Sequence, residues 1–457
     1  MSKLTGNISL WAAQALIGGV WSRDIRLTVE RSCIKTIERD VAPAPGDEQH
    51  WALLPGLPNL HSHAFQRGMA GLAERQGESA DSFWTWRDIM YRFVDRMQPH
   101  HLEAIAAMAY VEMVETGFTR VGEFHYLHHD PQGQPYADPA TMAHALTAAA
   151  QASGVALTLL PVFYAYAGFG EQPPTRGQRR FLHNPDSFAR LIEASRAAVA
   201  PLPDARVGIA PHSLRAVSKG ALEAILPLAA DGPVHIHVAE QVREVEDCLT
   251  AYGARPVEWL LANIEVDSRW CLVHATHMTP AETRAMAASG AIAGLCPITE
   301  ANLGDGLFSA HMFQRAAGRV GIGSDSNILI DPWEEMRLME YGQRLFERSR
   351  NILATGPGRS TGADIFRAVL DGGAGALGVR MDIAEGCSAD FVSLDPSHPS
   401  LACRDGDGLL DSLIFAAGRS AVDGVWRRGV RLVTAGRHHA RAGIVARYRQ
   451  SLETLIH

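Results

Sequence analysis

Short apolar segments alternate with helical stretches through the middle of this chain, and this alternation limits the possible fold more than any other feature. Clear helix starts lie between these segments, such as Thr279-Pro280-Ala281-Glu282, where an N-cap residue, a proline and a capping glutamate stand together. Strands that alternate with helices form parallel sheets. Eight such units over about 330 residues predict an α/β fold, a (β/α)8 TIM-type barrel with insertions, because about 250 residues is typical. The strand candidates are residues 53–60, 119–125, 155–162, 206–211, 233–238, 270–274, 291–296 and 320–324.

The two ends of the chain differ from its middle, because short alternating strands dominate them. Residues 25–37 alternate apolar and polar positions around a charged turn, and residues 390–394 and 424–430 have the same character. We therefore expect a small β-sandwich-like domain built from both ends, a barrel domain and a C-terminal helix. The expected boundaries are 1–55 with 386–440, 56–385 and 441–457.

The composition is that of a soluble globular protein and argues against several classes of function. The 457 residues are 47% hydrophobic and 20% charged, with a formal net charge of −8. A negative chain without a Lys/Arg-rich run does not suit nucleic acid or an anionic membrane surface. No segment approaches the length of a transmembrane helix. The six cysteines are scattered, which is typical of free thiols in a reducing compartment, so we expect a cytoplasmic protein.

Polar side chains collect at the ends of the predicted strands. Six of the eight candidates end in His, Glu or Asp, and in a barrel these ends converge on the face that carries the active site. A single histidine at a strand end is commonly structural, but six such ends favour a functional site. The residues are His61, His63, Glu123, His125, His212, His237, Glu240, His274 and Asp325.

Four of these residues predict a metal site. His61 and His63 are two apart on a strand, so their side chains point the same way and can bind one ion. His237 follows the fifth strand and Asp325 the eighth, although an Asp beside Ser and Asn can also be a turn or N-cap residue. His235 shares the face of His237 but lies deeper, so we expect it in the core. Three imidazoles and a carboxylate suit Zn²⁺ or a similar divalent ion, which lowers the pKa of a bound water.

Two arginines near the strand ends indicate an anionic substrate. Arg215 stands three residues after His212, and Arg87 lies in the long loop expected after the first strand. A guanidinium binds a carboxylate through a planar bidentate fork. One arginine alone is more commonly a surface residue, but the pair favours a small anionic substrate such as a dicarboxylate.

The arrangement of His61, His63, His237, His274 and Asp325 after strands one, five, six and eight resembles the amidohydrolase superfamily over essentially the whole chain. Many members hold two metal ions bridged by a carbamylated lysine at the end of strand four. Here no lysine follows that strand until Lys219. The chain therefore resembles the mononuclear deaminase branch, which implies one divalent ion, with zinc the expected metal.

The same resemblance implies three catalytic roles. Glu240 would carry a proton to the leaving nitrogen, and His274 would orient and polarise the attacking water. Asp325 would bind the metal and also accept the proton of that water. Glu240 also stands at an expected helix start, where an acid is favoured by the helix dipole, and this simpler interpretation stays open.

Four strings resemble superfamily members that deiminate N-formimino-L-glutamate in bacterial histidine degradation, and they occupy residues 60–67, 122–126, 211–215 and 273–277. This resemblance implies hydrolysis of that substrate to N-formyl-L-glutamate and ammonia by a homodimer. It also implies that the arginines bind the carboxylates. The implied substrate contacts are Gln66, Arg87, Tyr126, His212 and Arg215.

Two other functions remain open at this point. The chain could deaminate an aminated heterocycle of the guanine or cytosine type, with the same single metal ion. It could also be a barrel of this kind without metal that serves as a scaffold, although the retained ligands, Glu240 and His274 argue against that.

Overall fold

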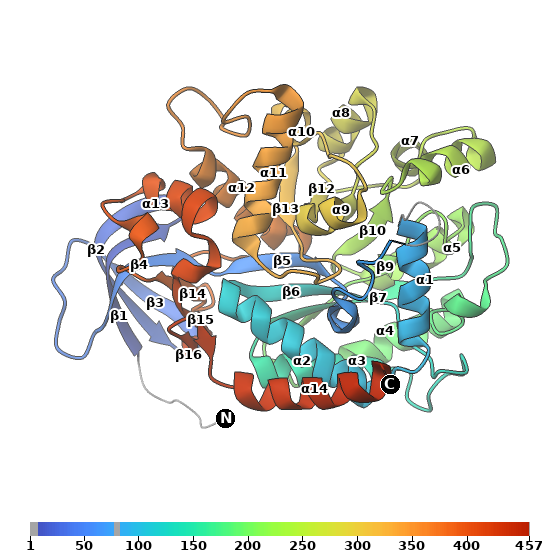
Figure 1. The fold of residues 1–457 in the computed structure, drawn as a ribbon, viewed down its shortest axis with the longest axis horizontal. Helices are drawn as coiled ribbons and strands as arrows, with labels where there is room; N and C mark the ends of the chain where they lie inside the picture. The colour runs from blue at the N-terminus through green and yellow to red at the C-terminus, as the bar shows by residue number, and fades with distance from the viewer. Residues whose placement is uncertain (1–7, 77–82, 457) are drawn as a thin grey trace.

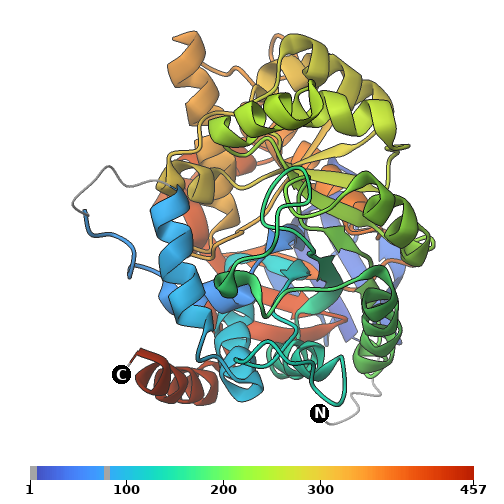
Figure 2. The same ribbon diagram turned by 90° about the vertical axis from the view of Figure 1, so that its right-hand side faces the viewer.

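The computed structural model describes residues 8–76 and 83–456. Residues 1–7 and 457, which the expected small domain and C-terminal helix include, lie outside the described residues. Parallel strands occupy the centre of the molecule with helices around them, and a separate sheet lies at one end (Figures 1 and 2). None of the described helices combines the length and apolar character needed to span a bilayer.

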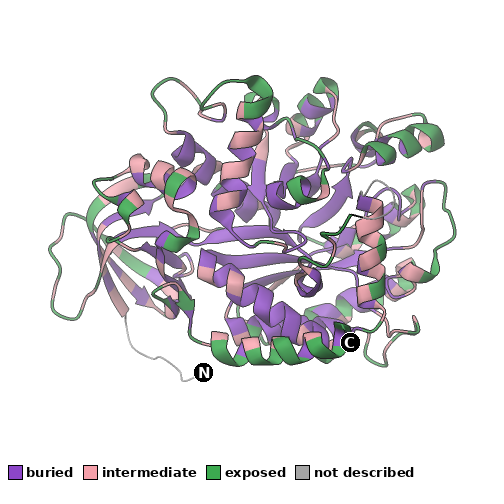
Figure 3. Cartoon of the chain, viewed as in Figure 1, coloured by how far each residue is buried: buried purple, intermediate pink, exposed green. Residues whose placement is uncertain are grey.

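The central strands form two parallel sheets. One has the order β10-β11-β12-β13, and the other has the order β5-β6-β7-β8, with β9 also paired to β7. These strands read as near-continuous apolar runs because helices cover parallel sheets, and Figure 3 shows them buried along their length. Their bounds are Leu57–Ser62 (β5), Phe118–His125 (β6), Ala156–Phe163 (β7), Arg206–Val207 (β8), Ala210–Pro211 (β9), Val234–Val238 (β10), Trp270–His274 (β11), Ile292–Leu295 (β12) and Arg319–Ile322 (β13).

Isolated bridges join the two parallel sheets to each other. Ser62, at the end of β5, pairs in parallel with Asp325, and Ser213 pairs with His237 of β10. Near Asp325, the His63 N–H donates to the Asp325 carbonyl at 2.9 Å, and the Asp325 N–H donates to the His61 carbonyl at 3.0 Å. The first and last parallel strands therefore meet at the residues predicted to bind metal.

The first and fourth predicted strands differ from the observed ones. The predicted strand 53–60 is two strands, because β4 ends at Pro55 in the terminal sheet and β5 begins at Leu57 in the central one. The chain crosses between the sheets at Gly56, where a Cβ atom would lie 2.3 Å from Thr119 Oγ1. The predicted strand 206–211 is broken into β8 and β9.

The strands near the two termini pair with each other in one mixed sheet. Its order is β17-β16-β15-β14-β4-β1-β2-β3, with β1 parallel to β4. A sandwich-like arrangement was expected, but the described strands form one continuous eight-stranded sheet rather than two separate ones. Their bounds are Ile8–Ile17 (β1), Val20–Glu30 (β2), Cys33–Glu38 (β3), Glu48–Pro55 (β4), Phe391–Leu394 (β14), Val422–Arg427 (β15), Val430–Thr434 (β16) and Arg437–His438 (β17).

Helices connect the central strands, and the predicted caps begin two of them. Thr279 accepts from the Glu282 N–H at the start of α8, and Asp331 accepts from the N–H groups of Trp333 and Glu334 at the start of α11. The helices with α labels are Phe83–Val94 (α1), Pro99–Thr116 (α2), Thr141–Ser153 (α3), Pro185–Val199 (α4), Lys219–Ile225 (α5), Val242–Tyr252 (α6), Pro256–Asn263 (α7), Pro280–Ser289 (α8), Pro297–Leu303 (α9), Ala310–Arg315 (α10), Pro332–Glu347 (α11), Thr361–Ala376 (α12), Asp407–Ser412 (α13) and Arg441–Ile456 (α14). Shorter turns of helix are Ala64–Met69 (η1), Arg176–Gln178 (η2), Leu226–Ala229 (η3), Pro399–Leu401 (η4), Leu413–Ala417 (η5) and Gly418–Ala421 (η6).

Helix α12 approaches the strands that carry the metal-site residues closely. A Cβ atom at Gly372 would lie 1.9 Å from the Val320 carbonyl oxygen in β13, and one at Gly373 would lie 2.5 Å from Pro58 Cγ in β5. The Val320 backbone cannot move aside as a flexible side chain can, so position 372 requires glycine, and the atom nearest position 373 belongs to the rigid ring of Pro58.

Gly372→Ala should therefore destabilise the protein. Overpacking costs about 1–3 kcal/mol, which exceeds the gain of up to about 1 kcal/mol from replacing a helical glycine by alanine. The free energy of unfolding, from urea denaturation, should fall accordingly. Gly443→Ala in α14 is the matched control, because nothing lies within 4 Å of its added Cβ. It should leave stability unchanged or raise it, and equal stability of the two variants would contradict the close approach.

Candidate active site and metal centre

Three imidazoles and one carboxylate meet at the ends of the central strands. His61 Nε2 lies 3.2 Å from His63 Nε2 and 3.2 Å from His237 Nε2. Asp325 Oδ1 lies 3.4 Å from His61 Nε2 and 3.3 Å from His63 Nε2. One ligand atom from each residue lies within 4.8 Å of all the others, and all four residues are buried. The structure thus brings together the four residues predicted to bind metal.

Hydrogen bonds of the His63 and His237 rings direct the lone pair of each Nε2 toward the space between the four predicted ligands. Nδ1 of His63 donates to the Phe124 carbonyl at 2.8 Å, and Nδ1 of His237 donates to the His212 carbonyl at 3.1 Å. A carbonyl only accepts, so the proton is on Nδ1 and Nε2 presents a lone pair. Burial lowers the pKa of His61, His63 and His237, which keeps the rings neutral. Neutral imidazole is the form that binds a metal ion.

The spacing of these atoms fits a divalent ion that binds all four residues. Ligands at about 2.0–2.1 Å from zinc in a tetrahedral arrangement lie about 3.3 Å from one another. Four of the six separations between these ligand atoms are 3.2–3.4 Å, and all six are within 4.8 Å. Several nitrogen lone pairs that face each other without a proton repel, and a cation between them removes the repulsion. Desolvation acts to raise the pKa of Asp325, but the neighbouring imidazoles outweigh it, so this carboxyl is ionised as a ligand must be.

Strained backbone marks the strand ends that carry this site. His274 has a φ of 68° and Asp325 a φ of 42°, both in the left-handed region that disfavours side chains. Such strain persists only where surrounding contacts fix the chain. The loop after β13 is fixed by Asn327, whose side-chain amide donates to Ser62 Oγ and to the carbonyls of His63 and Asp325.

Glu240, His274 and Asp325 surround the space beside the metal ligands. His274 Nε2 lies 3.8 Å from Glu240 Oε1 and 3.9 Å from Asp325 Oδ2. Burial raises the pKa of Glu240 above its ordinary value. Burial alone would lower the pKa of His274, but Glu240 and the hydrogen bond to Glu300 outweigh this and raise it. Glu240 precedes α6 by two residues, so it lies at a helix start and also in the site.

A second group of possible ligands lies next to the first. His274, Cys296 and Asp325 each offer an atom within 4.8 Å of the others, and all are buried. Burial raises the pKa of Cys296 well above its ordinary value, which favours the thiol over the thiolate that binds metal. The group shares Asp325 with the first site. Lys219, the lysine that follows the fourth predicted strand, is exposed at the start of α5, where it donates to Asn263.

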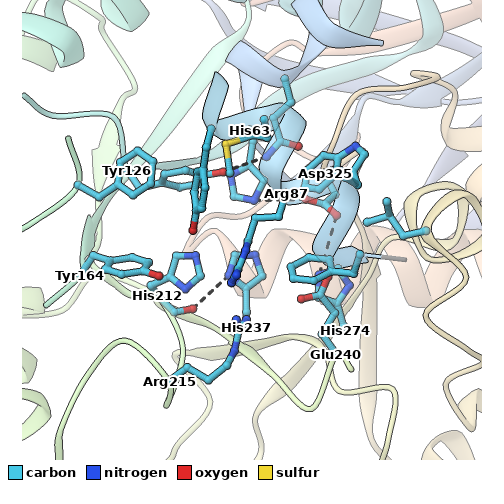
Figure 4. A pocket seen from close by; sticks show the side chains of 17 residues that line it. His63, Arg87, Tyr126, Tyr164, His212, Arg215, His237, Glu240, His274 and Asp325 are labelled. Atoms are coloured by element: carbon cyan, nitrogen blue, oxygen red, sulfur yellow. Dashed lines mark hydrogen bonds and ion pairs between the residues drawn. The ribbon is translucent and has the colours of Figure 1, made fainter. Parts of the chain in front are cut away.

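A single cavity lies over the ligands, and the predicted site residues other than His61 line it. Figure 4 shows Arg87 and Arg215 reaching into the cavity that Glu240, His274 and Asp325 also face. Arg215 has only one ion-pair partner among the described residues, Glu244 at 3.9 Å, and its buried Nε lacks a hydrogen bond there, as does that of Arg87. Guanidinium groups with unused donors suit a bound anion.

The other predicted contact residues also lie in the cavity wall. The Gln66 side-chain amide donates to the Tyr126 hydroxyl at 2.9 Å, while Gln66 Oε1 is buried without a hydrogen-bond partner among the described residues. His212 is half-buried, with its Nδ1 3.0 Å from Ser213 Oγ. These groups leave polar atoms free for a ligand.

Three other strand-end or near-strand residues have structural positions. His235 is fully buried, with Nε2 2.7 Å from the Ala376 carbonyl, as expected for a core histidine. The Glu123 carboxylate accepts from the Ala64 N–H at 2.7 Å and so supports the turn after His63. His125 is buried outside the cavity lining.

Several lining residues were not predicted from the sequence. Most are aromatic or apolar residues of α1 and neighbouring loops, where no motif distinguishes them from core residues. Tyr164 directly follows β7, so its place at a strand end was a signal that could have found it. The additional lining residues are Phe83, Trp86, Met90, Tyr91, Tyr164, Phe181 and Leu303.

Comparison with known proteins identifies relatives along nearly the whole chain. The curated formimidoylglutamate deiminase of Pseudomonas aeruginosa is 48% identical over 435 residues, which cover 94% of this chain and 95% of that protein. The 5-methylthioadenosine/S-adenosylhomocysteine deaminase of Shouchella clausii is 26% identical, over 84% and 82% of the two chains.

Solved structures give the same result. The crystal structure of an amidohydrolase from Brucella melitensis has a TM-score of 0.96 and 52% identity, and covers 98% of this chain and 100% of that one. An adenosine deaminase from Xanthomonas campestris with bound zinc has a TM-score of 0.82 and 25% identity, with 98% of each chain covered. The amidohydrolase family model matches residues 52–432. The chain therefore belongs to the amidohydrolase family.

Proposed function

We propose that this protein hydrolyses N-formimino-L-glutamate to N-formyl-L-glutamate and ammonia, as a step of histidine degradation. The observation that carries the proposal is the pair of guanidinium groups, Arg87 and Arg215, in the cavity that also contains the metal-ligand cluster. The 48% identity to a protein named formimidoylglutamate deiminase supports the same substrate.

We infer that the parallel strands form one (β/α)8 barrel. The bridges between Ser62 and Asp325 and between Ser213 and His237 support closure, because they join the two sheets at both edges. The barrel domain spans residues 56–385, the small domain joins 1–55 with 386–440, and a helix follows over 441–457. The passage from the terminal to the central sheet at Gly56 supports the first boundary.

One divalent ion, with zinc the expected metal, is held by His61, His63, His237 and Asp325. Such an ion, when bound, lowers the pKa of a water molecule and makes it nucleophilic at neutral pH. The separations of 3.2–3.4 Å between ligand atoms support this assignment.

Three side chains of the protein move and hold protons in the reaction. His274 orients the attacking water through Nε2, and Asp325 accepts a proton from it at Oδ2, 3.9 Å from that nitrogen. Glu240, 3.8 Å from the same nitrogen, transfers a proton to the leaving nitrogen of the formimino group. The raised pKa of Glu240 supports this role, because a general acid–base group works best when its pKa is near the operating pH. Both protons of the water end on the formimino =NH group, which departs as neutral ammonia, and the water oxygen becomes the carbonyl oxygen of the formyl group on the glutamate nitrogen.

The remaining cavity residues bind and orient the substrate. Arg87 and Arg215 bind its carboxylates, and Gln66, Tyr126 and His212 bind its polar groups near the reacting carbon. Burial of these groups excludes competing water, which strengthens each charge-assisted hydrogen bond.

A heterocycle deaminase is the alternative function. The aromatic lining of the cavity and the relatives named as adenosine-type deaminases favour it. The two arginines oppose it, because a neutral ring would leave the buried Nε groups of Arg87 and Arg215 without a charged acceptor.

The location and assembly of the protein are part of the proposal. The cysteines are all free in the described chain, which supports a reducing cytoplasm. The expected homodimer stays a prediction that sedimentation of the purified protein would test.

Ammonia release is the direct test of the proposed function. Purified protein should release ammonia from N-formimino-L-glutamate at a higher kcat/KM than from N-formimino-L-aspartate, guanine or cytosine. Activity on guanine or cytosine without activity on formimino-glutamate would support the alternative instead.

Metal analysis should give one divalent ion per chain, and chelation should abolish activity that zinc restores. The reason is that one four-ligand group is complete, whereas the second shares Asp325 and includes a thiol of raised pKa. His237→Ala should lower the metal content, whereas Cys296→Ser should leave it unchanged. A reproducible ratio near two, reduced by Cys296→Ser, would contradict the single site.

Glu240→Gln should reduce kcat by about 10²–10⁴-fold, the range for loss of general acid–base catalysis. Metal content and KM should change little, because Glu240 is not among the predicted ligands. Glu246→Gln is the control, since Glu246 is exposed on α6. A normal kcat for Glu240→Gln would contradict the proton-transfer role and leave Glu240 only as an acidic residue at the start of α6.

Arg215→Ala and Arg87→Ala should each lower kcat/KM for formimino-glutamate by about 30-fold to several thousand-fold. Truncating one partner of a buried, charge-assisted pair costs roughly 2–5 kcal/mol. Lysine should restore little, because an ammonium lacks the planar fork.

Arg243→Ala is the matched control for these two variants. Its guanidinium carbon lies 4.9 Å from the centroid of the Trp84 ring, but Arg243 does not line the cavity over the predicted metal ligands. It should change kcat/KM far less. Activity of all three variants on a ring substrate, with no turnover of formimino-glutamate, would contradict the proposed substrate. That result would leave the proposed metal site unaffected.

A further inference from the structure

The carboxylate of Glu300 contacts the ring nitrogen of His274 that does not face Glu240 and Asp325. Glu300 Oε1 lies 3.2 Å from His274 Nδ1, whereas Nε2 of the same ring faces Glu240 and Asp325. Both residues are buried, with 1% of the His274 side chain and 7% of the Glu300 side chain exposed. His274 is thus held between carboxylates on both of its nitrogens.

Glu300 is itself fixed by the protein. It lies in the first turn of α9, and its Oε1 also accepts from the N–H of Cys296, the N-cap of that helix, at 2.9 Å. The end of strand β12, which leads into α9, supplies none of the predicted ligands or catalytic residues. The helix that follows β12 supplies instead the Glu300 carboxylate, an acceptor of fixed position next to His274 at the end of the neighbouring strand β11.

We propose that Glu300 is a positioning residue for the reaction, which acts by fixing the orientation of the His274 ring. An ionised carboxylate only accepts, so its contact keeps a proton on Nδ1 and directs Nε2 toward the attacking water. Without this partner the ring can turn about its side-chain bonds, and Nε2 no longer keeps one direction. This inference rests on the catalytic role proposed above for His274.

Glu335 separates this role from simple support of helix α9. It is fully buried, and its carboxylate accepts from the Ile298 N–H at 2.8 Å, in the same first turn that Glu300 supports through Cys296. No contact between Glu335 and His274 is present in the described structure. The two glutamates therefore support the same helix start, and Glu300 alone of the two also contacts the imidazole.

Steady-state kinetics of Glu300→Gln and Glu335→Gln in the metal-loaded enzyme test the proposal. Replacing the outer partner of a site histidine lowers activity by about 10–100-fold. Glu300→Gln should lower kcat by this factor, with KM within about twofold of the parent value and metal content unchanged. Glu335→Gln should keep the parent kcat. Equal kcat values for the two variants would overturn the proposal.

A double mutant excludes a purely structural effect. If Glu300 acts through His274, then Glu300→Gln should cause no further loss in a His274→Ala background. A loss that adds fully to that of His274→Ala would overturn the proposal. This comparison also decides the case if Glu300→Gln lowers the melting temperature more than Glu335→Gln does, because a structural loss would persist in the double mutant.

Proton NMR in water gives a readout that does not need the substrate. The parent and Glu335→Gln should show a downfield N–H resonance of His274, assigned by its absence in His274→Ala, and Glu300→Gln should lose it or shift it upfield. An unchanged resonance in Glu300→Gln would overturn the proposal. Failure of the parent enzyme to release ammonia from formimino-glutamate would instead count against the proposed function, and the resonance would still decide whether Glu300 holds His274.

Discussion

The Nε2 atoms of His63 and His237 each lie 3.2 Å from Nε2 of His61, and the rest of the site depends on holding these ring nitrogens together. The arrangement is unfavourable without a cation, so the backbone must impose it before the ion binds. It does so where β5 meets the segment after β13, through paired hydrogen bonds between His63 and Asp325 and between Asp325 and His61. The ligand geometry is therefore a consequence of strand pairing rather than of flexible side chains.

Buried polar residues around this junction fix the strand ends further. Asn59 donates to Ser324 Oγ and accepts from the Ser324 N–H, and Ser324 in turn donates to Asn327. Because each of these buried groups has a partner, the network adds rigidity without leaving an unsatisfied polar atom. The close approach of α12 at Gly372 then fixes β13 from the other side.

The sequence predicted the part of the site that strand periodicity controls. Alternation places His61 and His63 on one side of a strand, and the convergence of strand ends brings in His237 and Asp325. The first strand was misplaced, because residues 53–60 read as one apolar run and nothing local marks Gly56 as a crossing between sheets. Glu300 was missed for a different reason: its role depends on how the start of α9 packs behind β11, and residue spacing carries no information on that packing.

Chemistry and substrate choice come from different parts of the fold. The ligands lie at strand ends, where a shift of one residue would turn the side chains to the other face, so they cannot change without loss of the site. Arg87 lies on α1, Gln66 on η1 and Arg215 in the turn after β9, all of them connections. Connections tolerate change because few backbone hydrogen bonds of the sheets depend on them. An amidohydrolase with these parallel sheets can thus keep one hydrolytic centre and accept a ring or a dicarboxylate according to which of these connections presents guanidinium groups to the cavity.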